Sequence, residues 1–261
     1  MPGHNTTYSV FYSRHINMLC YISISNRIID IRNASDVASC VESRIYGDAM
    51  NICEIFYSIQ GETTYSGLPC VFVRTSGCNL RCSYCDTKYA YESGVEMAVE
   101  EVFAQVRSYG CRLVEITGGE PLVQREEVNL LIDSLLQEGY RVLLETNGSL
   151  SIENVDRRVV RIMDLKCPDS GMSEYTRWEN ISYLSEHDQV KFVLSSRRDY
   201  EWAREVIAKY PVLSKTEVLL STAFGVLEPK DVVKWMLDDR LNARLQLQIH
   251  KYIWHPEARG L

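Results

Sequence analysis

The chain has 261 residues, of which 46% are hydrophobic and 24% charged, and its formal net charge is −7. This composition is typical of a soluble globular protein with one full-sized core, so we expect one main domain. The acidic balance argues against broad binding to nucleic-acid phosphates, although a local basic pocket could still bind a small anion. No stretch approaches the roughly 20 apolar residues of a membrane span, and no signal-peptide pattern opens the chain. The sequence therefore predicts a cytoplasmic protein with no nucleic-acid or membrane partner.

The first 49 residues differ from the rest of the chain. They mix polar and apolar residues without a sustained period, and their one short apolar run is Met18 to Ile24. Met50 then begins a strand-like segment that ends in a turn at Gly61. Two interpretations stay open: residues 1–49 are a poorly ordered extension, or translation starts at Met50. In both cases we predict that the folded domain spans 50–261.

From residue 71 onward, short apolar runs alternate with segments of helical period. We expect strands at 71–76, 113–117, 141–146, 160–165, 190–194, 217–220 and 245–249, and helices at 95–109, 126–137, 199–210 and 230–237. This alternation is typical of βα units around a parallel sheet. Six or seven units suit an incomplete barrel better than a closed one of eight. We predict an α/β fold, a partial, open (βα) barrel of about six strands.

Polar or glycine motifs follow several of these strands. They begin at Cys78, at Gly118-Gly119-Glu120, at Asn147-Gly148 and at Lys166. In parallel βα folds the functional site gathers at the carboxyl ends of the strands. We therefore expect these motifs to converge in space.

Three of the nine cysteines, Cys78, Cys82 and Cys85, lie within eight residues of one another. Clustering without a secretion signal favours metal binding over disulfides. Structural zinc usually takes four protein ligands, whereas three thiolates could hold a [4Fe–4S] cluster and leave one iron open. A zinc site or reduced loop cysteines remain the alternative. The other six are scattered and are expected to be small core or loop residues: Cys20, Cys40, Cys53, Cys70, Cys111 and Cys167.

Two motifs in sequence order resemble those of the radical S-adenosylmethionine (SAM) superfamily. The first is Cys-x3-Cys-x2-Cys with Tyr84 before its last cysteine, and the second is Thr117-Gly-Gly-Glu-Pro121. The resemblance implies the radical SAM fold, with SAM chelated to the open iron. One electron from the cluster then cleaves SAM to a radical that abstracts a hydrogen. The cofactor supplies this chemistry, while the protein positions it and excludes water.

Further motifs resemble the 7-carboxy-7-deazaguanine synthase family over Met50 to the end of the chain. They are Glu54-Ile-Phe-Tyr-Ser-Ile-Gln-Gly-Glu62, Gly67-x-Pro69, Phe72-Val-Arg74, Cys85-Asp86-Thr87, Asp164-Leu-Lys-Cys-Pro-Asp-Ser-Gly171 and Gln248-Ile-His-Lys-Tyr-Ile-Trp254. The resemblance implies a lyase that converts 6-carboxy-5,6,7,8-tetrahydropterin to 7-carboxy-7-deazaguanine in queuosine precursor biosynthesis. It also implies a requirement for Mg²⁺, a flavodoxin- or ferredoxin-type electron donor, and a homodimer.

The same resemblance implies roles for individual residues. The expected substrate contacts are Ile59, Gln60, Gly61, Arg74 and Thr117; the expected SAM contacts are Tyr84, Cys85, Asp86, Gly119, Asp164, Leu165, Lys166 and Ser221; the expected Mg²⁺ ligand is Thr87. Glycine lets backbone groups reach a flat pterin, and a guanidinium can bind both oxygens of a carboxylate. A threonine hydroxyl is a hard oxygen of the kind that Mg²⁺ prefers.

Some of these assignments have plain structural alternatives. Typical members carry Ser-Pro-Lys where this chain has Asp164-Leu165-Lys166, so only Lys166 carries over directly, and the match around Ser221 is loose. Arg74 could form a surface ion pair, and Thr87 could cap a helix. Two polar residues that end a strand, Glu145 and Asn147, could bind the SAM ribose or simply satisfy a loop.

Two rival functions remain open at this stage. A glycyl-radical activase of the same superfamily would share the cysteines and the Gly-Gly-Glu motif, but would not need the Gln60-Gly61 turn, Arg74 or Thr87. A non-catalytic Fe–S or zinc module would not cleave SAM.

Overall fold

The structure, a computed structural model, describes residues 20–24, 27–31 and 48–261. The chain divides into two units, Met1–Asp48 and Ala49–Leu261. In the first unit, β1 (Cys20–Ile24) and β2 (Arg27–Ile31) pair as an antiparallel hairpin. The apolar run expected from Met18 overlaps β1, whereas the expectation of a poorly ordered extension falls on residues outside the described ones.

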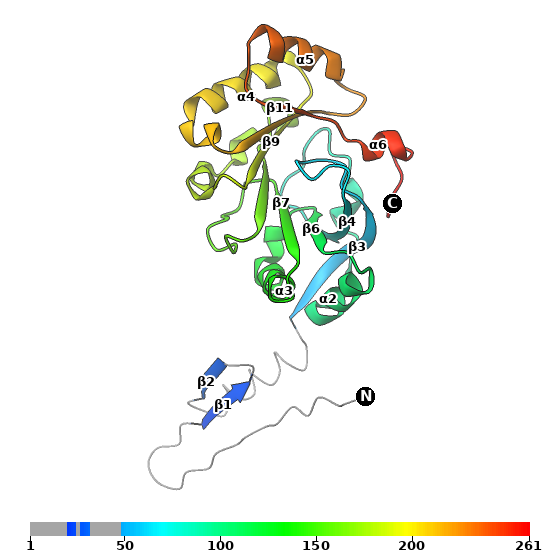
Figure 1. Cartoon of the computed structure of the whole chain (residues 1–261), viewed down its shortest axis with the longest axis vertical. Helices are drawn as coiled ribbons and strands as arrows, with labels where there is room; N and C mark the ends of the chain where they lie inside the picture. Colours follow the sequence, from blue (N-terminus) through cyan, green and yellow to red (C-terminus); the bar gives the residue numbers. More distant parts are fainter. Residues whose placement is uncertain (1–19, 25–26, 32–47) are drawn as a thin grey trace. The chain divides into compact units, whose positions relative to one another are not determined.

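The second unit is built on a nine-stranded sheet of order β11-β10-β9-β8-β7-β6-β4-β3-β5 (Figure 1). Its parallel strands are β4 (Pro69–Thr75), β6 (Leu113–Gly118), β7 (Arg141–Thr146), β8 (Val160–Asp164), β9 (Gln189–Leu194), β10 (Glu217–Thr222) and β11 (Arg244–Gln246). At one edge, β3 (Ala49–Ile59) and β5 (Val95–Ala98) run antiparallel to their neighbours. Within the described residues β11 and β5 do not pair, so the sheet stays open. The predicted α/β fold with a partial, open barrel is confirmed.

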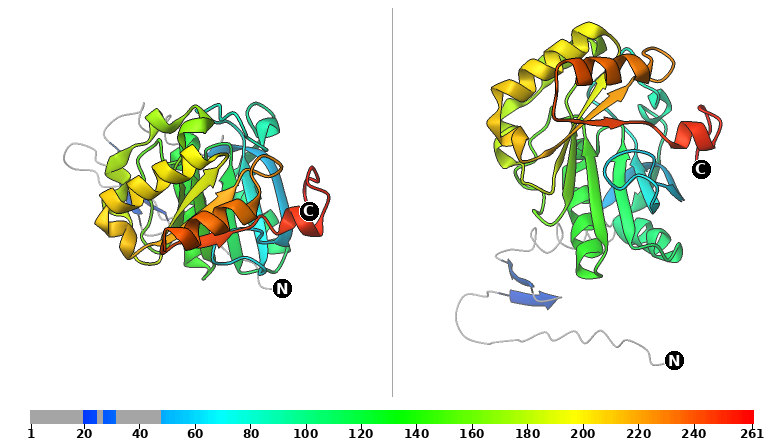
Figure 2. Two further views of the ribbon diagram at one scale, coloured as in Figure 1. Left: turned by 90° about the horizontal axis from the view of Figure 1, so that it is seen from above. Right: turned by 45° about the horizontal axis from the view of Figure 1, so that its top comes forward.

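Helices follow the strands and cover the outer face of the sheet (Figure 2). They are α2 (Val99–Ser108), α3 (Arg125–Gln137), α4 (Arg197–Lys209), α5 (Pro229–Asp238) and the short α6 (His250–Ile253), with 3-10 turns η1 (Lys88–Ala90), η2 (Pro121–Gln124), η3 (Pro168–Ser170), η4 (Ser173–Tyr175), η5 (Trp178–Tyr183) and η6 (Pro211–Ser214). The main core joins outward-facing strand residues such as Val114 and Ile116 to helix residues such as Leu131. Within the described residues, no helix combines the length and the apolar character needed to span a bilayer.

The inner face of the sheet carries a second, smaller apolar cluster. It consists of Cys70, Phe72, Leu113, Leu143, Val160 and Ile162. Because side chains alternate along a strand, the inner positions further along β6 are Glu115 and Thr117, which are polar. The inner surface is therefore apolar toward the amino ends of the strands and polar toward the carboxyl ends.

Two expected elements differ from the sequence prediction. The helix predicted for 95–109 begins only at Val99, because Val95–Ala98 form β5 and pair with β3 from Ala49 to Ile52. The strand predicted for 245–249 ends at Gln246. The chain then turns into α6, where the backbone N–H of Ile249 donates to the carbonyl of Gly61 at 3.0 Å.

A buried ion pair at the amino ends of the strands gives the first testable prediction. The Arg161 and Asp188 side chains are 2% and 0% exposed, and Asp188 accepts hydrogen bonds from Arg161 Nε at 3.1 Å and Nη2 at 2.5 Å. Replacing Asp188 with alanine leaves a buried guanidinium without its partner, so the free energy of unfolding should fall by about 3–5 kcal/mol. Chemical denaturation measures this loss. Asp156→Ala, which breaks the surface pair with Arg158, should change stability little; equal losses in both variants would contradict the prediction.

Candidate active site

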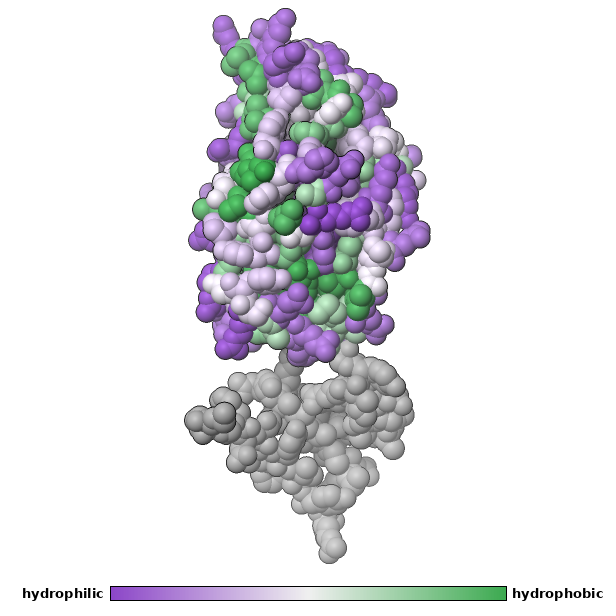
Figure 3. Space-filling model, turned by 90° about the vertical axis from the view of Figure 1, so that its right-hand side faces the viewer, coloured by the Kyte–Doolittle hydropathy of each residue, from purple (hydrophilic) through white to green (hydrophobic). Residues whose placement is uncertain are grey.

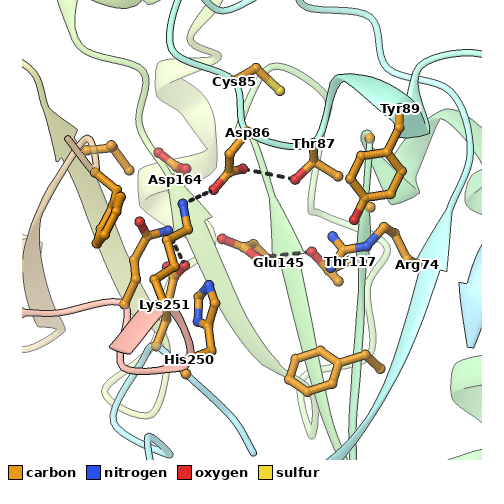
Figure 4. A pocket seen from close by; sticks show the side chains of 18 of the residues that line it. Arg74, Cys85, Asp86, Thr87, Tyr89, Thr117, Glu145, Asp164, His250 and Lys251 are labelled. Carbon is orange, nitrogen blue, oxygen red and sulfur yellow. Dashed lines mark hydrogen bonds and ion pairs between the residues drawn. The ribbon is translucent and has the colours of Figure 1, made fainter. Parts of the chain in front are cut away.

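The carboxyl ends of the strands open into a cavity of about 950 Å³. Its wall is formed by the ends of β4, β6, β7, β8 and β9, the turn at 59–62, the loop at 78–91 and the C-terminal segment at 248–261. Figure 4 shows side chains from these segments pointing toward one another around this space. Segments that are far apart in sequence are thus joined at one site.

Most of the residues singled out from the sequence line this cavity. They are Ile59, Gln60, Gly61, Arg74, Cys78, Cys82, Tyr84, Cys85, Asp86, Thr87, Thr117, Gly119, Glu145, Asn147, Asp164 and Lys166. Leu165 and Ser221 do not line it. Leu165 is fully buried in the main core because it follows Asp164, whose side chain faces the cavity, and successive side chains point to opposite faces. Ser221 is buried within β10.

The cysteine loop presents Cys78, Cys82 and Cys85 to the cavity, and no other described cysteine lines it. Burial raises the pKa of the Cys78 and Cys82 thiols, the latter to about 11, while the nearby ammonium of Lys166 acts in the opposite direction. Such thiols bind iron or zinc as thiolates. Within the described part of the chain, no three His, Cys, Asp or Glu side chains are grouped to hold a single metal ion. Three thiols without a fourth fit a [4Fe–4S] cluster with one open iron.

The Gly-Gly-Glu motif packs directly against the cysteine loop. A side chain at Gly119 would clash with the carbonyl oxygen of Gly77, so the close approach of the two loops requires glycine. Glu120 does not line the cavity but is fully buried, and it accepts hydrogen bonds from Thr146 Oγ1 at 2.8 Å and the Asn147 N–H at 2.6 Å. The glutamate therefore fixes the loop after β6 to the end of β7 and leaves the glycine backbone facing the cavity.

Asp164, at the end of β8, has an unused acceptor. Its Oδ2 accepts from Lys166 Nζ at 2.7 Å, but its buried Oδ1 has no hydrogen-bond partner among the described residues. A buried acceptor without a partner is costly, so such an atom on a cavity wall indicates a ligand that donates to it. Together with the glycine backbone opposite, this wall fits SAM, which carries an amino group and ribose hydroxyls.

Lys191 of β9 lies at the centre of a group of carboxylates. The side chain is 5% exposed, and its Nζ pairs with Glu62 at 2.8 Å, with Glu145, and with Asp164 at 3.7 Å. Burial alone would raise the pKa of Glu62, but the neighbouring ammonium of Lys191 lowers it to about 2. Glu145 also accepts a hydrogen bond from Thr117 Oγ1 at 3.0 Å. One lysine thus joins acidic side chains from three segments of the chain.

Gln60 holds the turn before β4 rather than pointing freely into the cavity. Its Nε2 donates to Glu115, and its Oε1 accepts from the Glu62 N–H at 2.6 Å. A side chain at Gly61 would clash with the imidazole of His250. The turn therefore offers backbone groups to the cavity, and its glycine leaves room for the C-terminal segment.

Glu115 gives a pH-dependent prediction. It is 4% exposed, and burial together with Glu145 raises its pKa to about 8. Between pH 4.5 and 8 the folded chain keeps a proton that the unfolded chain has lost, so the stability of the parent falls as the pH rises, by up to about 1.4 kcal/mol per pH unit. Glu115→Gln does not titrate. Denaturation should show its stability relative to the parent increasing from pH 6 to pH 8, whereas a constant difference would contradict the assignment.

Arg74 of β4 belongs to a small network with Glu54 and Tyr89. Its Nε donates to Glu54 Oε1 at 2.7 Å, and the Tyr89 hydroxyl donates to the same oxygen at 3.0 Å. Among the described residues, the two Nη groups of Arg74 have no hydrogen-bond partner. The guanidinium thus keeps its paired donors available to an anionic ligand.

The C-terminal segment is tied to the cysteine loop beside Thr87. Lys251 Nζ donates to Asp86 Oδ2 at 2.5 Å, and Thr87 Oγ1 donates to Asp86 Oδ1 at 2.9 Å (Figure 4). Burial would raise the pKa of Asp86, but Lys251 holds it well below its usual value. The Thr87 oxygen keeps its lone pairs and can still bind a cation.

The open βα sheet, the three-thiol loop and the glycine motif define a radical SAM enzyme. In agreement, residues 72–165 match the model of the Radical SAM superfamily. The solved structure of QueE from Escherichia coli shares the fold, with a TM-score of 0.65 and 21% identity over 78% of this chain and 96% of that one.

The comparisons with curated proteins identify the family. A 7-carboxy-7-deazaguanine synthase of Koribacter versatilis is 44% identical over 226 residues, covering 81% of this chain and all of that protein. One of Chlorobaculum tepidum is 46% identical over 215 residues, covering 81% and 97%. This chain belongs to the 7-carboxy-7-deazaguanine synthase family.

Several cavity residues have roles that the sequence reasoning did not assign: Glu62, Tyr89, Glu115, Lys191, His250, Lys251 and Arg259. Glu62, His250 and Lys251 lie within motifs that carried the family resemblance. Lys191 and Glu115 gave a weaker signal, because each is a single charge inside an apolar strand.

Proposed function

We propose that this chain converts 6-carboxy-5,6,7,8-tetrahydropterin to 7-carboxy-7-deazaguanine with loss of one ammonia. The proposal depends mainly on one observation: a single cavity joins the thiol loop to the Gln60-Gly61 turn, Arg74 and Thr117. These last residues are the ones that a glycyl-radical activase would not need. The family of the chain supports the same reaction.

One side of the cavity is assigned to the cofactors. Cys78, Cys82 and Cys85 would hold the [4Fe–4S] cluster, and the wall formed by Gly119, Asp164 and Lys166 would bind SAM. When bound, the cluster and SAM supply the radical chemistry. The protein holds its own groups in place around them, and Asp164 Oδ1 gains the donor that it lacks.

The other side is assigned to the pterin. The Nη groups of Arg74 would bind the substrate carboxylate in the two-pronged manner of a guanidinium. Glu62 and Glu145, which both pair with Lys191, would accept hydrogen bonds from the amino and ring N–H groups of the pterin edge. Thr87 would contribute an oxygen to Mg²⁺, whose remaining ligands are the substrate carboxylate and water.

We also propose the wider setting of the enzyme. A reducing cytoplasm suits free thiols and an Fe–S cluster, and a flavodoxin- or ferredoxin-type protein would supply the electron. The face that carries α6 has separate apolar patches among hydrophilic residues (Figure 3). On α6 and just after it, Tyr252, Ile253 and Trp254 are exposed, which supports a subunit contact in a homodimer. Residues 50–261 would carry the whole activity.

Arg74→Ala gives a residue-level prediction. A charge-assisted hydrogen bond contributes roughly 1.5–3 kcal/mol, so the loss of the guanidinium should weaken pterin binding by about tenfold or more. SAM binding and cluster absorbance should stay at the parent level, because Arg74 lies on the side of the cavity that is assigned to the pterin. Anaerobic calorimetry measures both affinities. Parent-like pterin binding in this variant would remove the main support for the substrate assignment.

The proposed function is tested by the nitrogen balance of the reaction. The reconstituted protein is incubated without oxygen with the carboxytetrahydropterin, SAM, Mg²⁺ and dithionite, and ammonia is measured against pterin consumed. One ammonia per pterin is expected, with no release when SAM or dithionite is omitted. SAM cleavage without pterin loss would instead favour an activase.

A further inference from the structure

The positive charges around the cavity are already paired, with one exception among the described residues. Lys166 pairs with Asp164, Lys191 with Glu62 and Glu145, Lys251 with Asp86, and Arg74 with Glu54. Arg259 also lines the cavity, but it forms no ion pair with any described residue. Burial lowers the pKa of His250, which favours its neutral imidazole.

Arg259 lies beside the network that holds Arg74. Its guanidinium carbon is 3.9 Å from the centre of the Tyr89 ring, and that of Arg74 is 6.0 Å from the same centre. Both distances fall within the range of a cation–π contact. The Glu54 carboxylate in this region is already paired with Arg74, whereas Arg259 forms no ion pair with any described residue. The Arg259 guanidinium is therefore available to an anionic ligand in the cavity.

The C-terminal segment contacts the cavity wall near its beginning and near its end. Gln248 Nε2 donates to Glu62 Oε1 at 2.8 Å, and Lys251 pairs with Asp86 at 2.5 Å. At the other end, a Cβ built on Gly260 would lie 3.9 Å from Glu54 Oε2, so the backbone next to Arg259 passes close to that carboxylate. These contacts hold the tail against the cavity wall, where Arg259 lies over the Tyr89 ring.

We propose that Arg259 is a second residue that binds the substrate carboxylate, and that the C-terminal tail thereby selects pterins that carry a carboxyl group. The inference rests on the proposed function and extends it. Arg74 uses its Nε for Glu54 and has its Nη groups free, so a second guanidinium can bind the other side of the same carboxylate. A carboxylate has about four lone-pair positions, so it can accept from the fork of Arg74 and one N–H of Arg259 and still offer one position to Mg²⁺.

The test compares two stable ligands that differ only in the carboxyl group, 6-carboxypterin and pterin. The reconstituted, SAM-loaded enzyme without reductant binds them without turnover, and anaerobic calorimetry gives both affinities. Arg259→Ala should weaken 6-carboxypterin binding by about tenfold and change pterin binding less than about twofold. Arg259→Lys should recover part of the loss, because it keeps the charge without the fork.

A matched control is Arg107→Ala, which removes an exposed arginine of α2 outside the cavity and should change neither affinity. Equal losses for both ligands in Arg259→Ala would overturn the proposal, because the tail would then act only as a wall. Unchanged binding of 6-carboxypterin would overturn it as well. Either outcome would leave the proposed function intact, provided that the parent binds 6-carboxypterin and releases ammonia from the tetrahydropterin substrate. A parent that binds neither pterin would contradict both the role of Arg259 and the proposed function.

Discussion

Replacing Cys82 with alanine is expected to abolish both the absorbance of the reconstituted [4Fe–4S] cluster and turnover. The cavity holds only three described thiols, and a cluster that already has an open iron cannot lose another protein ligand without falling apart or changing type. Absorbance, iron content and sulfide content measure the result. Cys78→Ala and Cys85→Ala should behave in the same way.

Cys111→Ala is the matched control. Cys111 is half-buried, its thiol lies beside the carbonyl of Pro69 at 3.3 Å, and it does not line the cavity. This variant should keep its cluster and its activity. A normal cluster in Cys82→Ala, or an equal loss in Cys111→Ala, would show that the ligands have been assigned wrongly.

Lys191→Met is expected to lower both the stability of the protein and its affinity for the pterin. It leaves Glu62, Glu145 and Asp164 close together without the ammonium that now pairs with all three. Removing one partner of a buried ion pair costs about 3–5 kcal/mol of folding free energy. Pterin binding should also fall, because at least one carboxylate will take up a proton and turn from acceptor to donor.

Chemical denaturation and anaerobic calorimetry together test this prediction. The deficit in stability should shrink as the pH is lowered toward 5, since the crowded carboxylates have raised pKa values in the variant and become neutral. Lys215→Met, at an exposed position, should behave like the parent at every pH. A Lys191→Met protein as stable as the parent would mean that the three carboxylates do not depend on the lysine.

Elements with a strong local pattern were predictable from the sequence. The strand expected at 141–146 coincides with β7, and the helix expected at 126–137 differs from α3 by one residue. The short strand β5 was missed because it forms only by pairing with a distant segment. Met50 and Ile52 of β3 pair at the sheet edge with Met97 and Val95. Pairing between segments more than 40 residues apart leaves no local signal.

In the candidate site, too, the residues in local sequence patterns were predictable, and those that depend on distant contacts were not. The cysteine loop and the glycine motif are local patterns whose spacing reflects their chemistry, so they could be recognised in sequence. The roles of Lys191 and Glu115 depend on which side chains the sheet brings next to them, and the residues directly before and after each of them in the sequence are apolar. Arg259 depends even more on the fold, because only the path of the tail places it against Tyr89.

The identity of the product tests the central claim most directly. The reconstituted parent is incubated anaerobically with 6-carboxy-5,6,7,8-tetrahydropterin, SAM, Mg²⁺ and dithionite, with Cys82→Ala in parallel, and the products are separated and weighed by mass spectrometry. We expect the parent to form 7-carboxy-7-deazaguanine, lighter than the substrate by one ammonia, and the variant to form none. Recovery of unchanged pterin from a parent that holds an intact cluster and cleaves SAM would contradict the proposed reaction.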